Sequence, residues 1–157
     1  MFKSYAPNTV YPPFGDYDHG VELPAGARLL SIAGQVGVKP DGSVPESVEA
    51  QCELVFRNIA AILGAAGMTM RDLVRMTSYI TRPEYYPAYQ QVKRRMIGAA
   101  RPSSTLVVVS GLAKPEWKIE IESWAATAGR AAAGRRTGTA RPRPRATRTR
   151  RVPRRRR

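Results

Sequence analysis

Two glutamates near residue 120 are the side chains of this chain best placed for acid–base chemistry. Glu120 and Glu122 lie in a predicted strand, Lys118–Ala125. Side chains alternate between the two faces of a strand, so both glutamates point away from Ile119 and Ile121. On a face that lines a cleft, a partly buried carboxylate beside a like charge has the raised pKa that proton transfer needs. A solvated strand face with alternating charges explains the same pattern equally well.

The other reactive residue types have no partners that would make a site. His19 is the single histidine, in a predicted loop, and Cys52 is the single cysteine, inside a helical pattern that predicts a core thiol. One imidazole and one thiol with dispersed acids predict no metal site. The glycines of residues 34–37 lack phosphate-loop spacing, so no nucleotide or other cofactor is expected. The tyrosines at positions 85, 86 and 89 have helical spacing, which favours core and interface over base stacking.

Apolar periodicity and turn residues predict the elements that position these side chains. A helix is expected where apolar residues recur at steps of three and four, and a strand where they alternate. Strands are predicted at Val21–Leu23, Arg28–Gln35, Val74–Ile80, Ser103–Ser110 and Lys118–Ala125, and helices at Glu46–Ala66 and from Pro83 to Gly98. The first two strands flank Pro24-Ala25-Gly26, which indicates a hairpin. The order β-β-α-β-α-β-β predicts a two-layer α+β domain.

The segment Thr105–Val109 is apolar on both faces. In a two-layer domain one face of the sheet packs on the helices, so the other face needs a different cover. The sequence therefore predicts self-association through the sheet.

Charge divides the chain into two parts. Residues 1–128 hold 13 Lys+Arg against 12 Asp+Glu, whereas residues 129–157 hold 13 Arg and no acid. The second part is expected to be a disordered tail, since it has almost no apolar residue to offset chain entropy. Nucleic acid is expected as a partner only through this tail. With no apolar run of membrane-spanning length and no signal-peptide core, we expect a cytoplasmic protein without membrane contact.

Two segments together resemble a known family. Residues 33–42 (AGQVGVKPDG) with Pro45, and residues 101–122 (RPSSTLVVVSGLAKPEWKIEIE), are similar to the RidA/YjgF family of imine and enamine deaminases. The resemblance implies a chorismate-mutase-like fold and a homotrimer with clefts between subunits. It also implies that a small substrate's carboxylate is held by a strand arginine and backbone amides. A glutamate-positioned water then attacks the C=N carbon and releases ammonia.

The resemblance assigns roles to individual positions. The water-positioning glutamate falls on Glu120 and the loop tyrosine on Tyr17. The substrate-binding amides fall on Gly34 and Leu106. A helix asparagine often found at the site falls on Tyr89, which is a poor match.

The substrate-gripping arginine falls on Ser104, because Pro102-Ser103-Ser104-Thr105 stands where active members have Pro-Ala-Arg-Ser/Thr. A serine offers one neutral hydrogen bond in place of a charged, bidentate one, so 2-imino acids should bind poorly and Ser104→Arg should improve them. Arg101 lies on the opposite strand face and is a doubtful substitute. Two hypotheses stay open: a hydrolase of small C=N compounds, and a non-catalytic trimer that binds a small ligand. An RNA-binding or ribonuclease role is less favoured.

Overall fold

The computed structural model describes residues 2–127. The predicted boundary at residue 128 and the Arg-rich segment 129–157 lie outside the described residues, so the tail stays a prediction. The strands are β1 (Lys3–Tyr5), β2 (Gly20–Glu22), β3 (Arg28–Val36), β4 (Leu73–Ile80), β5 (Ser103–Val108) and β6 (Ile119–Thr127). The helices are α1 (Val48–Ala65) and α2 (Tyr86–Ile97), with short 3₁₀ turns at Met70–Asp72 (η1) and Pro83–Tyr85 (η2).

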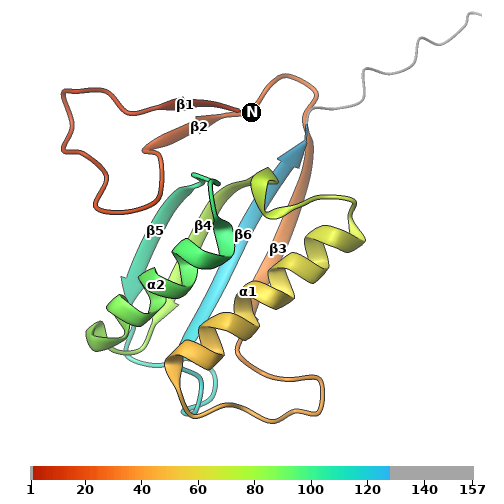
Figure 1. The fold of residues 1–157 in the computed structure, drawn as a ribbon, viewed down its shortest axis with the longest axis vertical. Helices are drawn as coiled ribbons and strands as arrows, with labels where there is room; N and C mark the ends of the chain where they lie inside the picture. Colours follow the sequence, from red (N-terminus) through yellow and green to blue (C-terminus); the bar gives the residue numbers. More distant parts are fainter. Residues whose placement is uncertain (1, 128–157) are drawn as a thin grey trace, which may run out of the picture.

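Four strands form one mixed sheet in the order β3-β6-β4-β5. β4 and β5 run parallel, and the other neighbours run antiparallel. Both helices lie on the same face of this sheet, α2 across β4 and β5 and α1 across β6 and β3 (Figure 1). The predicted two-layer α+β domain is confirmed.

The core lies between α1 and the sheet because each contributes one apolar face. The α1 residues Cys52, Val55, Phe56, Ile59 and Leu63 are fully buried, as are Ile119 and Ile121 of β6. Burial of each large apolar side chain stabilises the fold by about 1.5–3 kcal/mol. Cys52 is the predicted core thiol.

The N-terminal region departs from the predicted hairpin. β2 pairs with β1, a strand that the sequence analysis missed, and not with β3. Three-residue strands carry too weak an alternation to reveal their partner. The resulting two-stranded hairpin lies beyond the end of the main sheet at which β5 starts (Figure 1). Its long loop, residues 6–19, carries Tyr17 and His19.

The buried Gln51 side chain joins two loops at one end of the sheet, the loop before α1 and the loop before β6. The Gln51 side chain donates to the carbonyls of Pro45 and Glu116 at 2.8 and 3.0 Å and accepts from the Lys118 backbone at 2.9 Å. Its polar atoms are thus satisfied inside the core. Gly37 packs directly on it, since a Cβ there would lie 2.5 Å from the Gln51 Cβ.

The sheet face opposite the helices keeps large apolar side chains in contact with solvent. Leu29, Val107 and Trp124 are 51%, 40% and 45% exposed, and each alternates with a residue that packs into the core. We call this the open face. Among residues 2–127, no helix is long and apolar enough to cross a membrane.

Candidate active site

The sheet separates the predicted site residues into two groups. Gly34 and Glu120, which we call the open-face pair, belong to the face that the helices leave free. Tyr17, Tyr89 and Ser104 gather with Lys93 at the β5 edge on the helix side, and we call these four residues the edge cluster. The separation follows from strand alternation: Glu120 lies between buried Ile119 and Ile121, whereas Ser104 pairs in register with core residue Met76.

The open-face pair is a direct contact between a carboxylate and a glycine backbone. A Cβ on Gly34 would lie 1.8 Å from Glu120 Oε1 and 2.7 Å from its Cδ, so only glycine leaves room for this carboxylate. The register of β3 on β6 shifts between Ile32 and Gln35, and this irregularity brings Gly34 against β6. The carboxylate is half-buried there, as a group that orients a water molecule must be.

Tyr79 lies beside the same carboxylates on β4. Its hydroxyl donates a hydrogen bond to Glu122 Oε1 at 3.3 Å. Burial, followed by the negative charges of Glu122 and Glu120, raises the pKa of Tyr79. The phenol therefore stays protonated and keeps its hydrogen bond to Glu122 on the open face.

In the edge cluster, the Tyr89 side chain is buried too deeply to contact a substrate. Its side chain is 1% exposed, and its hydroxyl is 2.9 Å from Ser78 Oγ. Burial raises the pKa of Tyr89 to about 12. Leu106 also points its side chain into the core, although its strand, β5, is an edge strand of the sheet.

Lys93 is the member of the edge cluster that the sequence analysis missed. Its Nζ donates to Ser104 Oγ at 3.2 Å and lies 5.9 Å from the ring centroids of both Tyr17 and Tyr89. The residue is 2% exposed. A lysine four residues after Tyr89 shares its helix face, and this departure from an apolar stripe was the available signal.

Burial lowers the pKa of Lys93 to about 8. This value is the net result: the charge of Asp16 opposes the effect of burial, and the charge of Arg101 adds a smaller lowering. A cation therefore lies beside Ser104, the position at which the sequence resemblance predicts an arginine in other members of the family. An arginine introduced at position 104 would meet this ammonium group, so the benefit expected of Ser104→Arg becomes doubtful on electrostatic grounds.

The loop that carries Tyr17 is tied to α2 by an acidic residue. Asp16 pairs with Arg94 at 2.9 Å and with Arg101 at 3.4 Å, and the hydrogen bond from Arg94 lowers its pKa. The Tyr17 hydroxyl accepts from the Phe14 backbone at 3.3 Å. Arg101 also donates to the Gly98 and Ala100 carbonyls, so this arginine is engaged away from Ser104.

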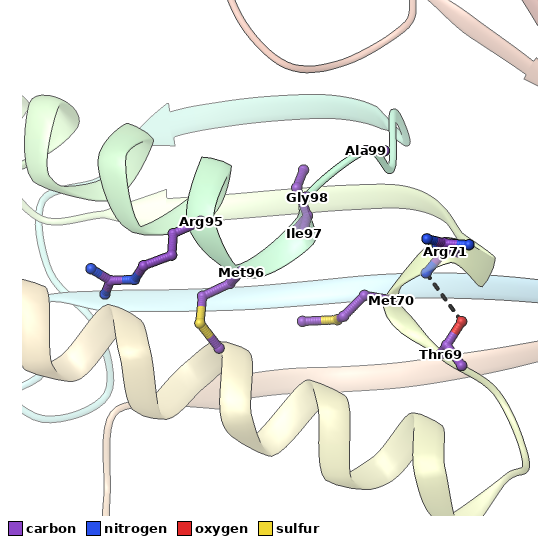
Figure 2. A pocket seen from close by; sticks show the side chains of 8 residues that line it. All are labelled: Thr69, Met70, Arg71, Arg95, Met96, Ile97, Gly98 and Ala99. Atoms are coloured by element: carbon purple, nitrogen blue, oxygen red, sulfur yellow. Dashed lines mark hydrogen bonds between the residues drawn. The ribbon is translucent and has the colours of Figure 1, made fainter.

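An open hollow of about 540 Å³ lies elsewhere, between η1 and the C-terminal end of α2 (Figure 2). Met70, Met96 and the backbone at Gly98 line it, and none of the predicted site residues does. His19 reaches the edge cluster only through an edge-to-face contact with the Tyr17 ring, at 5.9 Å between centroids, and its Nε2 lies 2.8 Å from the Tyr11 carbonyl. Within residues 2–127, no three histidine, cysteine or acidic side chains gather in a way that could hold a metal ion.

The open-face pair and the edge cluster supply complementary chemistry. A half-buried carboxylate can orient and deprotonate water, and an ammonium group beside a hydroxyl can hold an anion. Because they lie on opposite faces of one sheet, a single chain does not present both to one small molecule.

Comparison with known proteins gives a consistent family likeness. The family model described as endoribonuclease L-PSP matches residues 9–127. The putative reactive intermediate deaminase TdcF of Escherichia coli is 32% identical over 113 residues, which cover 69% of this chain and 84% of that protein.

Solved structures agree in fold. A Yersinia pestis protein of the conserved Rid family, YyfB, superposes with a TM-score of 0.72 at 34% identity, covering 80% of this chain and 98% of that one. The structure of E. coli TdcF with bound serine gives a TM-score of 0.60 at 29% identity, covering 80% and 99%.

Proposed function

Because the chain belongs to the endoribonuclease L-PSP family, which includes the RidA and YjgF proteins, we propose that it hydrolyses a small imine or enamine. The observation that carries this proposal is the contact of the Glu120 carboxylate with the Gly34 backbone. Both residues fall on positions that the family resemblance assigns to catalysis and substrate binding, and the fit of a carboxylate against glycine supports a built site.

In this reaction Glu120 accepts a proton as water adds to the C=N carbon. The proton then passes to nitrogen, which gives a carbinolamine. A second proton moves from the carbinolamine hydroxyl to nitrogen as the C–N bond breaks, and the products are a carbonyl compound and ammonia. The open-face pair thus supplies the water and the edge cluster binds the substrate, with Tyr17 and Ser104 nearest to it. One correctly positioned carboxylate is enough to activate the water that attacks the planar C=N carbon.

A homotrimer is the assembly that unites the two groups. The exposed Leu29, Val107 and Trp124 of the open face offer the apolar area that subunit contacts require. An arrangement with cyclic symmetry sets the open face of one copy against the β5 edge of the next, so each cleft receives one group from each subunit.

A second candidate is a trimer that binds a small ligand without turnover. TdcF has been solved with bound serine, so at least one relative accepts an amino acid in its structure. The absence of an arginine at position 104 does not distinguish the two candidates, since weaker binding of a carboxylate lowers the occupancy of the site in both.

Ammonia release from freshly generated 2-iminopropionate and from a neutral imine separates the two candidates. For the hydrolase we expect Glu120→Ala to lower kcat/KM by about 10²–10⁴-fold, the range for loss of a general base. Glu122→Ala is the matched control, because it removes a carboxylate two residues away on the same strand face. No activity above background in the wild type would leave the ligand-binding candidate, whereas equal activity in wild type and Glu120→Ala would remove Glu120 from the reaction.

A further inference from the structure

We propose that Lys93 and Ser104 together form a carboxylate-binding site that takes the place of the missing arginine. The inference rests on the proposed function for the identity of the ligand, a small 2-imino or 2-oxo acid. It adds a charged group, Lys93, to the single neutral hydrogen bond that the sequence analysis expected from Ser104.

The first argument is that Lys93 is a buried charge with too few partners. An ammonium group has three donors, and within residues 2–127 its only hydrogen bond goes to Ser104 Oγ, at 3.2 Å. Two donors are left for a ligand. Burial of a lysine at 2% exposure is costly unless the charge is paired, and paired burial is what an anionic ligand provides.

The second argument is that the nearby acid is already neutralised. Asp16 forms no hydrogen bond with Lys93, because its two carboxylate oxygens are bound by Arg94 and Arg101. Its negative charge attracts Lys93 only from a distance. In the described part of the chain, Lys93 forms no ion pair of its own. The charge is therefore unmatched inside the subunit.

The third argument is the shape of the surroundings. The rings of Tyr17 and Tyr89 lie 5.9 Å from Lys93 Nζ, within the range of cation–π attraction, and hold the ammonium group in position. Ser104 and Tyr17 are only half-buried, so they offer the way in from the β5 edge. A carboxylate entering there meets the Ser104 hydroxyl and the Lys93 ammonium group together.

The site differs from an arginine site in its response to pH. An arginine stays charged throughout the working range, whereas the pKa of Lys93 is about 8, set by burial with opposing contributions from Asp16 and Arg101. Carboxylate affinity should therefore fall as the pH rises through 8. Tyr89, with a pKa of about 12, stays neutral across this range.

Calorimetric titration of the full chain with pyruvate and with pyruvamide, its neutral isostere, tests the site. We expect Lys93→Met to weaken pyruvate binding by about tenfold or more, as loss of a charge-assisted hydrogen bond does, and to leave pyruvamide unchanged. Lys93→Arg should keep the preference for pyruvate and lose the decline between pH 7 and 9.5. Lys39→Met, in an exposed turn, controls for net charge.

Pyruvate binding that is absent in wild type, or equal in wild type and Lys93→Met, would overturn the inference. Ammonia release from 2-iminopropionate, measured on the same proteins, reports separately on the proposed function. Pyruvate binding that depends on Lys93 without any ammonia release would uphold the site and remove the hydrolase. Ammonia release that Lys93→Met leaves unchanged would uphold the hydrolase and remove the site.

Discussion

The open-face pair and the edge cluster differ in how each is held. Glu120 lies against a glycine on an accessible sheet face, and strand register alone puts it there. Lys93 is enclosed by two tyrosines, a serine and a loop that two arginines tie down through Asp16. The sequence resemblance predicts that the first group follows the family pattern and that the second, with Ser104, departs from it. On the proposed function, this chain retains the residues for hydrolysis and has rebuilt those that select the ligand.

Complementation between two inactive variants gives the largest expected effect. If each cleft takes its groups from different subunits, co-expressed Glu120→Ala and Lys93→Met chains form some clefts with both groups intact. In a cyclic trimer that contains both kinds of chain, one cleft in three has both groups intact, so we expect about a third of wild-type activity.

Ammonia release by the doubly tagged hetero-oligomer measures this recovery, and sedimentation equilibrium confirms the trimer. Recovery no greater than the mean of the two parent variants would mean that both groups serve one subunit. A monomer at micromolar concentration would remove the shared cleft altogether.

Gly34→Ala should act on the open-face pair alone. The added Cβ would lie 1.8 Å from Glu120 Oε1 and must displace the carboxylate. We expect kcat/KM to fall by about 10–100-fold, since small misplacements of a catalytic group are costly. The melting temperature should change little, because Gly34 is exposed. Gly111→Ala, where a Cβ meets nothing within 4 Å, is the matched control.

Lys93→Met should stabilise the unliganded protein at pH 7. The pKa of Lys93 is lowered from 10.5 to about 8 on folding, so the unfolded chain binds more protons between these values. The free energy of unfolding of the wild type therefore rises with pH through that window. We expect the variant to be more stable by about 1–3 kcal/mol below pH 8, a difference that vanishes above pH 10.5.

Urea unfolding at pH 7 and pH 10.5 measures this difference, with Lys39→Met as the exposed control. A Lys93→Met chain that is less stable than wild type at pH 7 would show that the ammonium group already has a partner inside the subunit.

Long periodic segments made most of the fold predictable. The apolar steps of α1 and the alternation of β6 predicted both elements and their buried faces, because burial forces a fixed period on the sequence. The β1–β2 pairing was not predictable, since three residues carry no reliable period and pairing depends on distant contacts. The start of α2 was predicted too early, at Pro83, because this residue opens a 3₁₀ turn and the helix itself begins at Tyr86.

The candidate site was predictable where it follows strand alternation. The family resemblance predicted one site for Glu120 and Gly34, which do lie together, whereas the Tyr89 side chain faces the core. Lys93 was missed because a lysine in a helix is usually solvated, and only the fold shows that this one lies beneath Tyr17. Sequence spacing places residues on faces, but it does not show which loop will cover a face.

The Gln51 side chain has a consequence for the order of folding events. Two of its bonds reach partners 65 and 67 residues along the chain, at the turn into β6. Contacts of such long range form only after the intervening chain has ordered, because closing a long loop early loses more entropy than one bond returns. We therefore expect the Gln51 bonds to form late in folding, so that they slow unfolding and contribute little to the first contact between the helices and the sheet.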